Sequence, residues 1–186
     1  MPDQEQSILE AALRGGREGR ERFYRCYSQR LMYVIGLYLR DREEAEDALQ
    51  EAFVRIFDSL PRFRRHGNGS LFAWMRSIAV HAACDHLRNA DAFRKVDLDE
   101  LQPELYPVED PPDKAPPSPP MDELRQMIAR LPLHQQTVFK LRYFENKRHE
   151  EIARELHIKE KTSSSLLWHA REKLRKMIQK YWEEQQ

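Results

Sequence analysis

The apolar positions of residues 41–60 recur with the spacing of an α-helix. The segment reads DREEAEDALQEAFVRIFDSL, and its apolar residues follow the i, i+3, i+4, i+7 pattern from end to end. Asp41 followed by Glu44 is typical of a capped helix start, and Pro61 comes directly after the last apolar residue. We therefore predict an amphipathic helix whose apolar side organises the first half of the chain.

The opposite side of this predicted helix is acidic. Its polar positions are Glu43, Glu46, Asp47, Gln50 and Glu51, and Val54 lies beside them. A solvated helix face usually mixes charges of both signs, whereas an acidic face with an apolar neighbour suits docking on a basic partner helix. The pattern of this helix alone leaves both interpretations open.

Helical periodicity continues through most of the chain, and no stretch alternates as a strand would. Further helices are predicted over 7–13, 18–40, 71–89, 122–131, 133–144, 149–156 and 160–181. Residues 94–120 differ, because they hold eight of the eleven prolines, which exclude a helix or a central strand. We predict an all-α protein with two small helical domains, a bundle over 1–93 and a second domain over 121–186, joined by an acidic Pro-rich linker.

The zero net charge of the chain is a sum of unlike blocks. Residues 1–93 have no net charge, residues 94–120 carry a net charge of −4, and residues 121–186 carry +4. A basic block at the end of the chain admits a polyanionic partner.

Two cysteines, Cys26 and Cys84, are too few for a disulfide framework. Both lie among apolar helical neighbours, so we expect buried thiols in a reducing compartment. The N-terminus is polar and acidic, and no apolar run approaches the length of a bilayer crossing. These features predict a cytoplasmic protein without membrane insertion.

Residues 149–170 have the spacing of a helix-turn-helix. A short helix with the small Ala153 at the crossing point precedes a three-residue turn and a second helix. The second helix would place its first residues in the major groove, where lysines and hydroxyls bind phosphates and base edges. The candidate DNA-binding residues are Lys159, Lys161, Thr162, Ser164, Ser165, Trp168, His169, Arg171 and Lys173. Short helix pairs also occur by chance, and the basic charge of this block favours the DNA-binding interpretation.

Arginines and aromatic residues alternate in the segment that follows the acidic helix. The residues of this pattern are Arg62, Phe63, Arg64 and Arg65, followed by Phe72, Trp74 and Arg76. Arginine binds phosphate, and an exposed aromatic ring stacks on an unpaired base, so the segment predicts single-strand binding. The alternative is that Phe72 and Trp74 belong to the core. Two residues apart on a helix, these rings cannot share one face, so at least one of them should lie near the surface.

Enzymatic chemistry finds little support in the sequence. There is no phosphate-binding Gly-rich loop and no G-x-S-x-G motif. His81 and Cys84 have the spacing to share a metal, but two further ligands at suitable spacing are missing. We therefore predict no catalytic residues, no metal and no cofactor.

The order of these parts resembles the bacterial RNA polymerase sigma factors of the extracytoplasmic-function type, also called group 4. The resemblance is carried by DREEAEDALQEAFVRIF at 41–57, SLFAWMRSIAVHAACDHLR at 70–88, ARLPLHQQTVFKLRYFE at 129–145, EEIARELHI at 150–158 and HAREKLR at 169–175. It implies sigma region 2 over 18–90 and region 4 over 121–182. The implied function is a transcription initiation factor that binds core RNA polymerase, directs it to promoter DNA and helps to melt the −10 element. A sigma-like DNA-binding regulator that does not itself initiate is the alternative.

The resemblance also implies roles for individual residues. Asp47, Gln50, Glu51 and Val54 would contact the polymerase, and Asn68 and Arg88 would join the arginines and aromatic residues above at the −10 element. The helix-turn-helix would read the −35 element. Ser164, Leu166 and His169 stand where the family usually has basic residues, which leaves the −35 preference open. An anti-sigma factor is a common partner in this family, and no residue here decides whether one exists.

Overall fold

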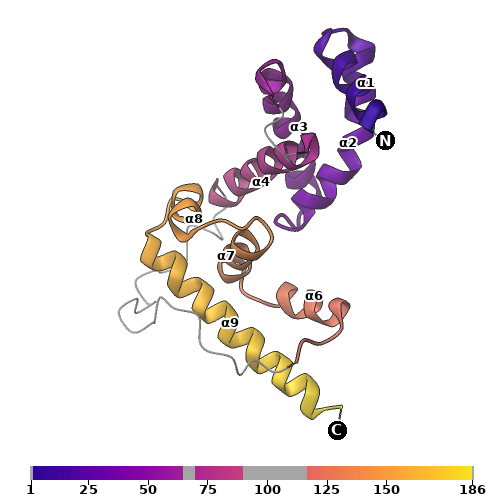
Figure 1. Cartoon of the computed structure of the whole chain (residues 1–186). Coiled ribbons are helices and arrows are strands. Elements are labelled where there is room, and N and C mark those ends of the chain that lie inside the picture. Colours follow the sequence, from indigo (N-terminus) through magenta and orange to yellow (C-terminus); the bar gives the residue numbers. More distant parts are fainter. Residues whose placement is uncertain (1, 65–69, 90–116, 186) are drawn as a thin grey trace. The chain divides into compact units, whose positions relative to one another are not determined.

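The computed structural model describes residues 2–64, 70–89 and 117–185 (Figure 1). It divides into two compact units, Met1–Ala90 and Asp91–Gln186, which we call the N-terminal and C-terminal units. All regular elements in the described residues are helical, which confirms the all-α prediction. Most of the predicted linker lies outside the described residues. None of the helices described has both the length and the apolar character needed to cross a membrane.

The N-terminal unit packs four α-helices and one 3₁₀ turn around an apolar core. The elements are α1 (Pro2–Leu13), α2 (Arg17–Gly36), α3 (Arg42–Ser59), η1 (Leu60–Arg62) and α4 (Leu71–Asn89). Phe23 near the start of α2 contacts Phe57 near the end of α3, with ring centroids 5.7 Å apart, so these two helices are antiparallel. The largest fully buried side chains of the unit are Tyr38, Phe23, Leu31, Ile35, Ile56, Leu71, Met75 and Val80.

Helix α3 forms as its sequence pattern predicts. The Asp41 carboxylate accepts a hydrogen bond of 3.0 Å from the backbone N–H of Glu44, which satisfies one of the unpaired donors at the helix start. The apolar stripe is buried at Ala45, Ala48, Leu49, Ala52, Phe53, Ile56 and Leu60. A helix of moderate length is stable mainly through such a packed face, so α3 is fixed by its contacts with α2 and α4.

Two predictions about α2 are wrong. The helix ends at Gly36 rather than at residue 40, because Leu37 and Tyr38 turn the chain through i→i+3 hydrogen bonds that bring Tyr38 and Leu39 into the core. Cys26 is exposed, since it lies on the solvent side of α2, whereas Cys84 on α4 is buried as expected.

The C-terminal unit contains α6 (Met121–Ala129), α7 (Leu133–Tyr143), α8 (His149–Leu156) and α9 (Glu160–Glu183). One apolar cluster joins α6, the turn after it and α9, and it consists of Met127, Ile128, Leu131, Ala170 and Leu174. Further along α9, the Trp182 indole N–H donates to the carbonyl of Pro117 at 2.8 Å. The start of the described segment is therefore attached to the end of the longest helix.

Short turns fix the position of α8 between α7 and α9. Asn146 and His157 adopt the left-handed backbone conformation, with φ of 53° and 54°. The backbone N–H of Arg148 donates to the Glu151 carboxylate at 2.8 Å, which supplies half of a capping box although an arginine side chain has no acceptor. The buried Glu155 forms an ion pair with Lys147 across the turn.

Candidate functional site

The acidic side of α3 faces solvent, as the sequence predicts. Asp47, Gln50 and Glu51 are exposed, and they follow one another at the i, i+3, i+4 spacing that puts residues on one helix face. Val54 lies one turn further along and is 60% exposed. An apolar side chain this exposed beside carboxylates contributes little to the packing of the unit, and it is available to a partner. We call these four residues the α3 face.

A chain of ion pairs connects the α3 face to α4. The Glu51 carboxylate lies 3.4 Å from the Arg55 guanidinium and 3.3 Å from the His86 imidazole. Arg55 in turn pairs with Asp85 at 2.6 Å, and Asp85 also pairs with Arg88. These side chains are partly exposed, so each pair is weak on its own, but together they fix where Arg88 lies.

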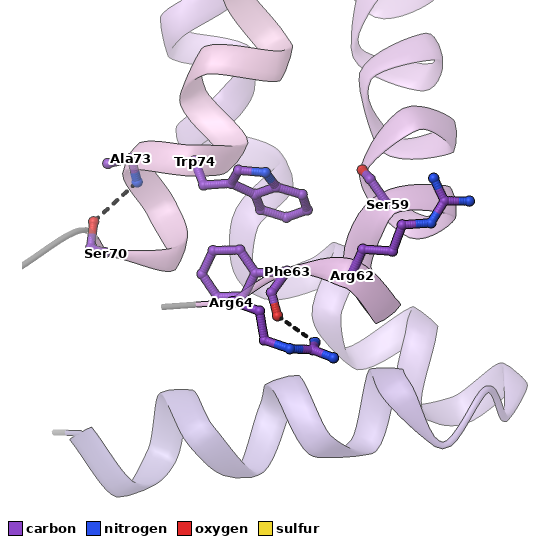
Figure 2. Close-up of a pocket in the computed structure, with 7 residues that line it drawn as sticks. All are labelled: Ser59, Arg62, Phe63, Arg64, Ser70, Ala73 and Trp74. Carbon is purple, nitrogen blue, oxygen red and sulfur yellow. Dashed lines mark hydrogen bonds between the residues drawn. The ribbon is translucent and has the colours of Figure 1, made fainter. Parts of the chain in front are cut away.

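Residues at the end of α3, in and just after η1, and at the start of α4 line an open pocket of about 430 Å³ (Figure 2). Its aromatic wall consists of Phe63, just after η1, and Trp74 on α4, whose ring centroids are 4.8 Å apart. The hydroxyl of Ser70 at the pocket edge accepts a hydrogen bond of 3.0 Å from the Ala73 N–H, which caps α4. This η1–α4 pocket is therefore built from a capped helix start and a 3₁₀ turn.

The charged groups of the η1–α4 pocket are arginines. Arg62 and Arg64 line it and are exposed, and Arg64 donates to the carbonyls of Pro61 and Phe63 at 3.0 Å each. An aromatic wall flanked by guanidinium groups can stack an unpaired base and bind the phosphates on either side of it. The predicted residues Arg65 and Asn68 belong to 65–69, which lies outside the described residues.

Phe72 and Trp74 point to different sides of α4, as their spacing predicts. Both rings are half-buried. Phe72 lies toward α2, where the guanidinium of Arg30 stands 3.8 Å from the centre of its ring. Arg76, one turn after Phe72, lines a hollow on the same side, so these two predicted residues do not belong to the η1–α4 pocket.

The predicted DNA-binding residues of α9 divide by exposure. Lys159, Lys161 and Lys173 are exposed, and Ser164, Trp168, His169 and Arg171 are half-buried. Thr162 and Ser165 are buried, with 7% and 1% of their surface exposed. A buried hydroxyl offers no surface to DNA, so these two residues serve the packing of α9 against α7 and α8 in this conformation.

Sequence reasoning missed a buried polar contact between α8 and α9. The Nδ1 atom of His149 lies 2.9 Å from the Oγ atom of Ser163, which is fully buried. Burial lowers the pKa of His149, and the nearby Arg142 lowers it further, against an opposite effect of Glu160. His149 begins α8, and nothing in its spacing shows that its ring lies against the next helix. The pKa of His169 on α9 is also lowered, by burial and by Lys173.

Each of the two units matches the model of a known protein family. The family model "Sigma-70 region 2" matches residues 23–93, and "Sigma-70, region 4" matches residues 121–174. The RNA polymerase sigma-H factor of Pseudomonas aeruginosa is 28% identical over 186 residues, covering 95% of each chain. The ECF RNA polymerase sigma factor SigX of Bacillus subtilis is 27% identical, over 74% of this chain and 72% of its own.

Among solved structures, the comparison finds the sigma factor RpoE of Bartonella quintana, crystallised with the anti-sigma factor NepR. It covers 86% of this chain and 96% of its own, at 16% identity and a TM-score of 0.46. The family matches cover the helices that carry the α3 face, the η1–α4 pocket and the helix-turn-helix. The chain belongs to the RNA polymerase sigma factors of the extracytoplasmic-function type, the non-enzymatic initiation factors that direct RNA polymerase to promoters.

Proposed function

We propose that the initiation function is divided among three surfaces of this chain. The α3 face binds core RNA polymerase, the η1–α4 pocket captures a base of the opened −10 element, and the first half of α9 reads the −35 element. The observation that carries the proposal is the η1–α4 pocket, because it combines an aromatic wall with exposed arginines at the start of α4.

Base capture fits the physical requirements of strand opening. Flipping a base out of the duplex costs about a few kcal/mol, and stacking on an aromatic side chain returns about 1–3 kcal/mol per base. In the η1–α4 pocket, Phe63 and Trp74 supply the stacking surface and Arg62 and Arg64 supply the positive charge. Arg88, held by Asp85 at the other end of α4, is proposed to bind a phosphate further along the DNA.

Polymerase docking fits the exposure of the α3 face. Asp47, Gln50 and Glu51 are available for charged and polar contacts with a basic helix, and Val54 supplies an apolar contact at their edge. The buried stripe of the same helix holds the fold, so the two sides of α3 can be tested separately.

Reading of the −35 element is proposed for the accessible residues of α9. They are Lys159, Lys161, Ser164, Trp168, His169, Arg171 and Lys173, and the buried Thr162 and Ser165 leave the set of contacts. We further propose that residues 1–93 and 121–186 act as the two DNA-recognition domains and that 94–120 links them. The site of action is then the cytoplasm, where the polymerase works.

The proposal is tested first with the purified chain and core RNA polymerase. Co-elution on gel filtration and run-off transcription from promoters recovered by sequencing polymerase-bound DNA in cells are expected. A chain that binds DNA tightly on its own, but neither binds core polymerase nor supports run-off transcription, would instead be a regulator that does not initiate.

Base capture is tested with Trp74→Ala. Holoenzyme with this variant should assemble normally but lose permanganate reactivity of the −10 thymines, because the stacking surface is gone. Trp168→Ala in the C-terminal unit is the matched control, and it should leave binding to a fork-junction DNA without a −35 element unchanged. Wild-type strand opening by Trp74→Ala would remove the pocket from the mechanism.

A further inference from the structure

The ring of His149 lies where α8 meets its two neighbouring helices. His149 is the first residue of α8, which packs against both α7 and α9. Its Nδ1 atom lies 2.9 Å from the hydroxyl of Ser163 on α9, and Arg142 of α7 is close enough to act on its charge. We propose that His149 positions the start of α9 for reading the −35 element only while its ring is neutral, so that acid weakens this reading. The inference rests on the proposed function, since it requires that α9 contacts the −35 element.

The start of α9 depends on its neighbours for its position. Lys159 precedes the helix and makes no capping hydrogen bond, because an ammonium group has no acceptor. Ser163, at the end of the first turn, has a fully buried side chain that contacts His149. Lys161 and Ser164, both proposed to contact the −35 element, lie within two residues of it. Hydrogen bonds to base edges and phosphates tolerate only small displacements, so a shift at Ser163 is expected to change the reading of DNA.

The surroundings of the His149 ring favour its neutral form. Arg142 of α7 and Glu160 of α9 are the charged groups that act on the ring from the neighbouring helices. Burial lowers the pKa of His149 most, Arg142 lowers it further, and Glu160 opposes them. The Arg142 guanidinium donates to the carbonyl of Lys147 at 3.4 Å, which holds this cation in place. Glu160 is exposed, so water and salt screen its attraction for the ring.

Protonation acts through charge rather than through the hydrogen bond itself. The neutral ring has one donor and one acceptor, whereas the imidazolium has two donors. The hydroxyl of Ser163 can turn and accept from the protonated ring, so the hydrogen bond survives the change. The cost is a second cation beside Arg142 in a half-buried position, and it is relieved when the ring moves into water. That movement releases Ser163, and α9 loses the contact that positions its first turn.

A ring that touched the DNA backbone would respond to acid in the opposite direction. Phosphates favour an imidazolium, so binding would then strengthen as the pH falls. The Nδ1 atom of His149 faces a fully buried hydroxyl, which favours a positioning role over a direct contact. The direction of the pH response therefore distinguishes the two roles.

The test compares two duplexes bound by holoenzyme at pH 7.5 and at pH 5.5. One duplex carries the −35 element of a promoter recovered from cells, and the other carries the same element scrambled. The ratio of the two affinities cancels the general effect of pH on the polymerase and on non-specific binding. The wild-type ratio should fall by about threefold, within the limit of roughly tenfold that one excluded proton sets for each pH unit below the ordinary histidine value.

His149→Asn should have the same ratio at both pH values, because its amide can bond to the Ser163 hydroxyl but does not titrate. His157→Asn is the matched control, since it removes an exposed imidazole at the other end of α8 and should keep the wild-type fall. Ser163→Ala removes the partner and keeps the ring, so its ratio should already be low at pH 7.5. Circular dichroism at both pH values shows that each variant is folded where it is measured.

Four results would overturn this role of His149. The wild-type ratio could be the same at both pH values, or it could rise in acid. The fall could persist in His149→Asn and disappear in His169→Asn, which would assign it to the other ring whose pKa is lowered by burial. Ser163→Ala could keep the wild-type ratio at pH 7.5. A wild-type holoenzyme without any preference for the −35 element at pH 7.5 would instead count against the proposed function itself.

Discussion

Asp47 and Glu51 lie one turn apart on the α3 face but have different surroundings. Glu51 is engaged by Arg55 and His86, whereas Asp47 is exposed and has no ion pair with any described residue. Reversing the charge of Glu51 would also disturb the ion pairs that reach Arg88 through Asp85. Asp47 is therefore the residue at which polymerase docking can be tested without disturbing α4.

We expect Asp47→Lys to weaken core polymerase binding by about tenfold or more, because it places a cation against a basic partner surface. Competition with wild-type chain for core polymerase measures the effect. Glu18→Lys, an exposed charge reversal in the first turn of α2, is the control, because it lies outside the acidic side of α3. Equal losses of helicity and of polymerase binding would make Asp47 a structural residue.

His149 gives the C-terminal unit a predictable response to acid. Its pKa is lower in the folded chain than the ordinary value, so the folded state favours the neutral ring. The stabilisation is therefore present above the ordinary pKa of histidine, about 6.5, and is lost as the pH falls through the lowered value. His169 contributes in the same direction.

His149→Asn should reduce the fall in unfolding temperature between pH 7.5 and pH 5.5, because it removes the imidazole that takes up a proton in this range. The Asn amide can still form a hydrogen bond with the Ser163 hydroxyl. Differential scanning calorimetry at several pH values measures it. His157→Asn is the control, because His157 is exposed and Asn tolerates its left-handed backbone. A pH response identical to wild type in His149→Asn would mean that this histidine does not control stability.

At the scale of elements, the backbones of α1 and α2 approach each other closely at Gly19. A Cβ atom at this position would lie 2.1 Å from the carbonyl oxygen of Ala11 and 2.6 Å from its carbon. These are backbone atoms of α1, so no side chain can move aside, and the helices would have to separate.

Gly19→Ala should therefore lower the unfolding temperature and speed amide exchange in α1, although alanine favours a helix by about 1 kcal/mol over glycine. Hydrogen exchange followed by mass spectrometry reports on both helices. Gly36→Ala, at the other end of α2, meets nothing within 4 Å and should leave exchange in α1 unchanged. Slower exchange in α1 of Gly19→Ala would show that the two helices separate without cost.

The sequence predicts elements better than contacts between them. Apolar periodicity placed α3, α4 and α8 closely, because each helix has one wide apolar face and a recognisable start. Periodicity could not predict the close contact between α1 and α2 at Gly19, because a close approach between helices leaves no periodic signal. It also could not separate Thr162 and Ser165 from Ser164, because hydroxyl side chains are used both inside and outside a helix pair. The pairing of Phe63 with Trp74 depends on the turn at η1. The spacing of arginines and aromatic residues suggests a binding segment but does not show which rings meet.

At the scale of the whole molecule, charge is separated along the chain. The net charge is zero, yet residues 121–186 carry +4 and residues 94–120 carry −4. A protein of this kind can bind a polyanion with one part and remain uncharged as a whole. The salt dependence of binding to a −35 element should therefore come from particular cations of α9 rather than from net charge.

Lys161→Gln should reduce the slope of log affinity against log salt for holoenzyme on a duplex −35 element by about 0.9, the value for one lost phosphate contact. Arg171→Ala should act in the same way if its half-buried guanidinium reaches a phosphate. Lys180→Gln is the control on the same helix, because Lys180 pairs with Glu184 in its last turn. Filter binding between about 50 and 200 mM salt covers the range in which such contacts dominate. An unchanged slope in Lys161→Gln would place this lysine outside the DNA contacts. If all three variants kept the wild-type slope, another part of α9 would enter the groove.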